Sequence, residues 1–199
     1  MSRFFDRFTA FDFVIMAMMS AIGVAVKPFI TALAHMITGP FMIPGGTVAG
    51  GVYMLFLILG AAIVGKRGAA TIIALVEALL VVVTGILGSH GILSFVTYLL
   101  PGLAVDILWF IMRHNGCCAL CCFFGGIIAN IFGCFTVNMV FFRLPLIPLM
   151  IMLSTAAISG GIGGIIAWNI NKVLMKYGLT GTKKRNYQPQ PQNEEANDE

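Results

Sequence analysis

Three charged residues lie inside long apolar stretches of this chain: Lys27, Glu77 and Asp106. A charge in hydrocarbon costs several kcal/mol unless it is paired or hydrated, so such residues are functional candidates by default. At 1.5 Å per residue, Glu77 lies roughly 13 Å and Asp106 about 10 Å from the nearest basic end of its stretch. The two carboxylates could therefore line one cavity and neutralise a cationic ligand. Alternatively, each acid is protonated or hydrogen-bonded to a nearby Ser, Asn or backbone group.

Lys27 allows two interpretations. It lies near the far end of the first apolar stretch, where a long side chain can extend its ammonium group to the water interface. The sequence favours this placement. The alternative is a salt bridge or a contact with an anionic ligand inside the protein.

Polar and aromatic side chains elsewhere in the chain add hydrogen-bonding and stacking groups. They are Tyr53, Tyr98, His90, Asn130 and Asn138. The two asparagines are eight residues apart, which places them on similar faces of one helix. Together these residues would suit an aromatic, partly polar solute. For each aromatic residue the alternative is packing or interfacial anchoring, and His90 could be a solvated loop residue.

The amino-acid composition indicates the environment in which these residues lie. Of the 199 residues, 59% are hydrophobic and 10% are charged, whereas soluble domains have about 45–50% and about 25%. A mean hydropathy of +0.96 excludes a soluble enzyme, a nucleic-acid module and a disordered protein. The apolar runs of about 20 residues fit helical crossings and lack the alternation of a β-barrel. We predict an all-α integral membrane protein.

The chain is predicted to cross the membrane six times. The predicted spans are Phe11–His35, Pro44–Val64, Gly68–Leu87, Ile92–Met112, Cys117–Phe142 and Leu146–Met175. Pro28 is expected to kink the first span or end its regular part.

The orientation follows from the basic residues, which concentrate on one side of the predicted bundle. Short basic loops stay in the cytoplasm, so both termini are predicted to be cytoplasmic in a multi-pass protein of the cell membrane. We divide the chain into a cytoplasmic N-terminus at 1–10, a transmembrane substrate-binding domain at 11–177 and a disordered tail at 178–199.

Two groups of small residues predict close helix contacts. Ala17, Ala21 and Ala25 repeat every fourth residue in the first span. The second group, in the sixth span, consists of Gly160, Gly161, Gly163 and Gly164. Internal packing is expected to use one group, and a partner subunit could use the stripe in the first span.

The motif CCxxCC at Cys117, Cys118, Cys121 and Cys122 has the spacing of a thiolate metal cluster. No complementary ligand set accompanies it. We therefore favour reduced thiols at the membrane edge, where palmitoylation is an option, over a metal site or structural disulfides.

The stretches GKRGAATIIALVEALL and GSHGILSFVTYLLPGLAVDILW resemble the substrate-binding S-components of energy-coupling factor (ECF) transporters. The resemblance is to the branch assigned to thiamine and its hydroxymethylpyrimidine precursor, and it covers about a third of the chain. It implies six helices, an outward-opening pocket and a topple of the whole subunit to release a vitamin. Glu77 and Asp106 fall where this branch carries acids, but Thr84 stands where the branch has a further one.

The resemblance also implies partners: a transmembrane coupling (T) subunit and two cytoplasmic ATPases that hydrolyse the ATP. The family docks its coupling subunit on an AxxxA stripe, which Ala17, Ala21 and Ala25 match. The sequence contains no GxxxxGK[ST] or HExxH motif, so we predict a transport subunit rather than an enzyme, without a cofactor of its own.

Other functions stay open. The substrate could be a larger cofactor such as a corrinoid or another tetrapyrrole. The chain could instead be an ion-coupled small-solute transporter with Glu77 and Asp106 as a proton relay, or a membrane assembly protein without a ligand.

Overall fold

The computed structural model describes residues 8–38, 45–85, 93–113, 116 and 118–177. The helices are α2 (Ala10–Thr38), α3 (Gly45–Val64), α4 (Ala69–Thr84), α5 (Leu93–Met112), α6 (Ala119–Val137), the π-helical segment η2 (Asn138–Phe142) and α7 (Leu146–Lys176). The described residues contain no strand, so the all-α prediction is confirmed for them. The tail predicted at 178–199 lies outside the described residues, as does most of the predicted N-terminal segment.

Five of these helices are long and apolar enough to cross a membrane. The helix in the predicted third span, α4, has 16 residues and rises about 24 Å, less than a hydrocarbon core of about 30 Å. Helix α2 continues through Pro28 to Thr38, so this proline does not end the helix. Neighbouring helices in a bundle can satisfy the backbone groups that a proline leaves unpaired.

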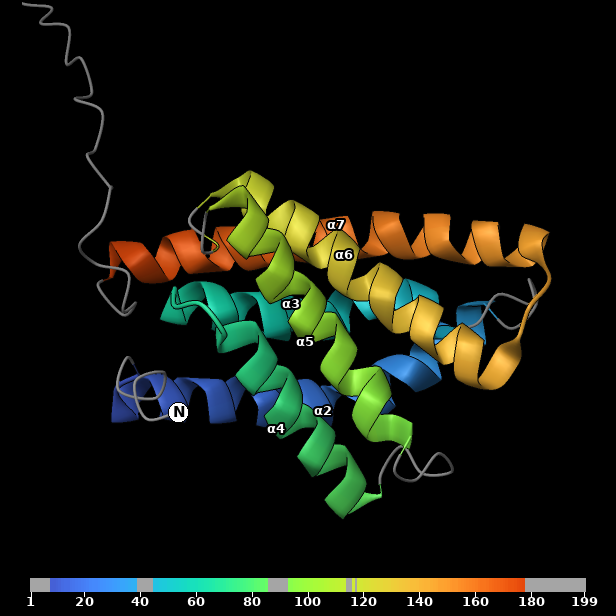
Figure 1. Cartoon of the computed structure of the whole chain (residues 1–199), viewed down its shortest axis with the longest axis horizontal. Helices are drawn as coiled ribbons and strands as arrows, with labels where there is room; N and C mark the ends of the chain where they lie inside the picture. The colour runs from blue at the N-terminus through green and yellow to red at the C-terminus, as the bar shows by residue number, and fades with distance from the viewer. Residues whose placement is uncertain (1–7, 39–44, 86–92, 114–115, 117, 178–199) are drawn as a thin grey trace, which may run out of the picture.

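The helices form one bundle with α3 as its most buried long member. Figure 1 shows α2, α3 and α7 along the long axis, with α4, α5 and α6 oblique to it. Helix α7 packs against α6 and α3, α4 packs against α5, and α2 packs against α3 and α4. The core combines apolar side chains from several helices, among them Ile58, Ile73 and Val105.

Glycines let α7 approach its neighbours to backbone contact. A Cβ atom added at Gly164 would lie 2.2 Å from the carbonyl oxygen of Cys122 on α6. One added at Gly163 would lie 2.1 Å from the carbonyl oxygen of Gly51 on α3. The glycine group of the sixth predicted span therefore serves internal packing.

We expect Gly164→Ala to destabilise the protein, because the added methyl group meets backbone that cannot rotate away. Overpacking of this kind costs about 1–3 kcal/mol, which lowers the melting temperature by roughly 2–12 °C. Gly46→Ala is the matched control, since its Cβ meets nothing within 4 Å. Thermal unfolding of both variants in detergent checks the prediction, and equal melting temperatures would contradict it.

Candidate functional site

A buried ion pair joins α2 to α4. The Nζ atom of Lys27 lies 2.7 Å from Oε2 of Glu77, and the two side chains are 5% and 6% exposed. The prediction that Lys27 extends to the water interface is therefore wrong. Its ammonium group points into the bundle and is neutralised there by a carboxylate.

The spacing of buried residues on α2 explains this direction. Met16, Ser20, Val24 and Lys27 are all buried, and they recur at helical spacing on one face. The hydroxyl of Ser20 donates to the carbonyl oxygen of Ile73 on α4 at 3.0 Å. This bond sets α2 against α4 one helical turn before Glu77, so Lys27 meets the carboxylate.

Two tyrosines surround the ammonium group. Nζ of Lys27 lies 4.2 Å from the ring centroid of Tyr98 on α5 and 6.0 Å from that of Tyr53 on α3. The hydroxyl groups of Tyr53 and Thr31 are 2.6 Å apart, and Thr31 donates to the carbonyl oxygen of Lys27 at 2.7 Å. We call Lys27, Tyr53, Glu77 and Tyr98 the Lys27–Glu77 cluster, to which four helices contribute one residue each.

One oxygen of the cluster has no donor. Oε1 of Glu77 is buried and has no hydrogen-bond partner among the described residues. Gly23 makes room beside it, since a Cβ atom at that position would lie 2.8 Å from Oε1. A buried acceptor without a donor is costly, and a ligand that donates to Oε1 would remove this cost.

Asp106 has a different environment. Helix α4 is preceded by Gly68, which has φ 89° and no side chain that could cap the helix. Asp106 of α5 instead supplies the acceptors for the N–H groups at the start of α4. Its carboxylate accepts from the backbone N–H groups of Gly68 and Thr71 at 3.2 and 2.7 Å and from the hydroxyl of Thr71 at 2.5 Å. Glu77 lies about 9 Å further along the axis of α4 than Thr71. The structure therefore does not bring the two carboxylates together.

The two asparagines also make structural contacts away from the cluster. Nδ2 of Asn130 donates to the carbonyl oxygens of Thr47 and Ala156 at 3.3 and 2.8 Å, which joins α6 to α3 and α7. Oδ1 of Asn138 accepts from the backbone N–H of Leu144 at 3.1 Å and closes the turn before α7. His90 lies outside the described residues.

The alanine stripe predicted on the first span lies on the exposed face of α2. Ala17, Ala21 and Ala25 are exposed, and exposed Met18 and Ile22 lie beside them. This face is opposite in character to the face that carries Lys27, so one helix presents a buried charge on one side and a smooth apolar surface on the other.

Metal ligands do not gather in the part of the chain that the structure describes. No group of three or more His, Cys, Asp or Glu side chains is placed there to hold an ion. The arrangement in the Lys27–Glu77 cluster instead offers one carboxylate oxygen, one ammonium group and aromatic surface.

We expect Lys27→Met and Glu77→Gln each to destabilise the protein strongly. Removing one partner of a buried pair costs about 3–5 kcal/mol, because the other charge stays buried without compensation. The double variant should lose much less free energy of unfolding than the sum of the two single variants. Thermal unfolding of the four proteins measures this coupling.

The control is Lys66→Met. Lys66 pairs with Asp12, but its side chain is 33% exposed. Without Lys66, the buried carboxylate of Asp12 keeps the backbone N–H and the hydroxyl of Thr9 as donors at 2.7 and 2.8 Å, so breaking this pair costs less. If the stability losses of Lys27→Met and Glu77→Gln simply added up in their double variant, Lys27 and Glu77 would not interact.

Two comparisons with known proteins bear on this site. The family model described as "ABC-type cobalt transport system, permease component" matches residues 11–132. No curated protein sequence matches the chain.

A solved structure described as "Crystal structure of an S-component of ECF transporter" has a TM-score of 0.70 to this chain at 20% sequence identity, over 86% of this chain and 88% of the other. At this identity the likeness shows the fold. It confirms the resemblance to S-components predicted from the sequence, although the thiamine branch is not confirmed.

Proposed function

Because the chain belongs to the family of permease components of ABC-type cobalt transport systems, we propose that it is the substrate-capturing subunit of an ECF-type importer. The observation that carries this proposal is the Lys27–Glu77 cluster with its unpartnered Oε1. A solute that satisfies Oε1 would be held by the protein without any covalent step. The ATP would be hydrolysed by separate ATPase subunits that reach this chain through a transmembrane coupling subunit.

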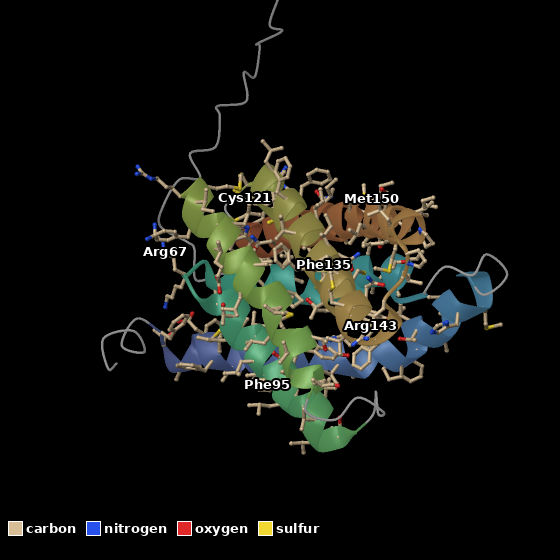
Figure 2. The ribbon with its side chains drawn as sticks, turned by 45° about the vertical axis from the view of Figure 1, so that its right-hand side comes forward. Arg67, Phe95, Cys121, Phe135, Arg143 and Met150 are labelled. Atoms are coloured by element: carbon tan, nitrogen blue, oxygen red, sulfur yellow. The ribbon has the colours of Figure 1, made fainter. Side chains whose placement is uncertain are left out.

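The position of the cluster favours capture from outside the cell. Lys27 lies about 25 Å along α2 from Ala10, and Tyr98 about 22 Å along α5 from Arg113, at 1.5 Å per residue. Both are thus far from the basic end of the bundle, where Figure 2 shows Arg67. With six spans and both termini in the cytoplasm, the cluster would lie in the outer half of the membrane.

The chemistry of the cluster favours a small nitrogen heterocycle. Lys27 and Glu77 cancel each other's charge, so the cluster as a whole does not demand a strongly charged ligand. Oε1 of Glu77 would accept from an amino N–H, the ammonium group of Lys27 would donate to a ring nitrogen or hydroxyl, and the ring of Tyr98 would stack on the solute. An aminopyrimidine such as the hydroxymethylpyrimidine precursor of thiamine has these groups, so we propose a vitamin or vitamin precursor of this class.

Cobalt is the second candidate, because the description of the matching family names it. The described residues favour it less, since Nζ of Lys27 is 2.7 Å from the carboxylate that would have to bind the cation. A corrinoid would need a much larger pocket than one ion pair and two phenol rings. An ion-coupled carrier with Glu77 and Asp106 as a proton relay is favoured less, because Asp106 is held by Gly68 and Thr71 and the two carboxylates do not meet. An assembly protein without a ligand would leave Oε1 of Glu77 without a role.

We expect hydroxymethylpyrimidine or thiamine to raise the melting temperature of the purified protein, because a ligand that binds the folded state stabilises it. At 100 times the dissociation constant the gain is about 2.7 kcal/mol, or roughly 5–11 °C. Cobalt ion and cobalamin are tested in the same way for comparison. Tyr98→Leu should remove most of the shift by removing the stacking ring, and Glu77→Gln should do the same.

The matched control is Asp106→Asn. It should lower the melting temperature of the unliganded protein, because α4 loses a charged acceptor, yet leave the ligand-induced shift unchanged. A shift with cobalt ion alone, or an equal loss of the shift in Asp106→Asn and Tyr98→Leu, would count against the proposed site.

We further propose that the exposed stripe of Ala17, Ala21 and Ala25 docks the coupling subunit. Small residues let a second helix approach closely, so Ala21→Leu should reduce recovery of coupling and ATPase subunits at least tenfold in co-purification. Ala119→Leu, which enlarges an exposed alanine on α6, should leave recovery unchanged. Equal recovery with both variants would exclude this surface as the docking site.

A further inference from the structure

Two cysteine thiols meet at the start of α6. Cys118 is the N-cap residue of this helix, with φ −140° and ψ 162°, and Cys121 follows in the first turn. Their Sγ atoms are 2.8 Å apart. Cys118 is half-buried and Cys121 is fully buried.

The number of ligands distinguishes a disulfide precursor from a metal site. A structural zinc site takes four ligands. The two thiols here contact each other, and no third His, Cys, Asp or Glu side chain joins them among the described residues. The spacing Cys-x-x-Cys is that of thiol–disulfide exchange motifs.

The neighbouring groups hold this geometry in place. Nε1 of Trp109 on α5 donates to the carbonyl oxygen of Cys121 at 3.0 Å, and the Trp109 ring is buried. The thiol of Cys122 donates to the carbonyl oxygen of Gly116 at 3.6 Å.

We propose that Cys118 and Cys121 form a reactive dithiol that closes to an intramolecular disulfide by exchange with a low-molecular-weight disulfide. The partly exposed Cys118 attacks as the thiolate, having released its proton to solvent. It forms a mixed disulfide with one half of the oxidant, and the other half leaves as a thiolate that takes up a proton. Cys121 then attacks Sγ of Cys118 and expels the second half, and the proton that Cys121 gives up passes to the leaving sulfur, which departs as a thiol. Two protein thiols are thereby oxidised and one small disulfide is reduced to two thiols.

The order of attack follows from exposure. A small disulfide can reach the half-buried Cys118, whereas Cys121 is enclosed by the helix start and by α5. Cys121 can react only with a sulfur atom already beside it. This dithiol stands apart from the Lys27–Glu77 cluster: Figure 2 shows Cys121 at the same end of the bundle as Arg67. The proposal therefore does not depend on the transported substrate.

The test uses the full-length protein in detergent, equilibrated with mixtures of oxidised and reduced glutathione. After acid quenching and unfolding, N-ethylmaleimide labels the remaining thiols, and tandem mass spectrometry maps the peptide between Arg113 and Arg143, which holds all five cysteines. We expect oxidised protein to lose two of its five labels, at Cys118 and Cys121, with no glutathione retained.

Two variants separate the roles of the thiols. Cys121→Ser should accumulate glutathione on Cys118, because no second thiol is present to expel it, whereas Cys118→Ser should form neither adduct nor disulfide. Cys134→Ser, further along α6, should behave as the unmodified protein. Five labels retained under oxidising conditions, a disulfide that includes Cys117 or Cys122, or an adduct on Cys121 in Cys118→Ser would each overturn the proposal.

Discussion

Two opposite charges enclosed by apolar helices are tolerated only in contact with each other, because each has lost its hydration. Lys27 and Glu77 meet this condition at 2.7 Å, and the arrangement of α2, α3, α4 and α5 around them depends on it. Each helix contributes one side chain to the cluster, so a shift of any of them would separate the charges or uncover them. The cost of such separation, several kcal/mol, makes the pair a constraint on the position of all four helices.

The helices themselves were predictable from local pattern. The second predicted span, Pro44–Val64, corresponds to α3 at Gly45–Val64, because the apolar run ends at the Gly65–Arg67 loop. The glycines of α7 were predictable as a packing surface for the same reason, since small side chains at helical spacing have few other uses. The structure adds which neighbours they meet: Gly51 of α3 and Cys122 of α6.

The hydrogen-bond and ion-pair partners of the charged residues were harder to predict from the sequence. The donors that hold Asp106 come from Gly68 and Thr71, more than thirty positions earlier, and no local pattern gives a contact between separate helices. For Lys27 a signal existed in the spacing from Met16, Ser20 and Val24, which form the buried face of α2. The sequence indicated where Lys27 lies along the helix, but the direction of its side chain around the helix axis decided its role.

Helix α2 carries its exposed alanines and its buried lysine on different faces, with only Val26 between Ala25 and Lys27. Successive residues of an α-helix are separated by about 100° of rotation. A single-residue insertion here would therefore turn the ammonium group away from Glu77 or, equally, turn the alanines inward. Homologues that keep both faces should consequently tolerate substitutions along α2 far better than changes in its length.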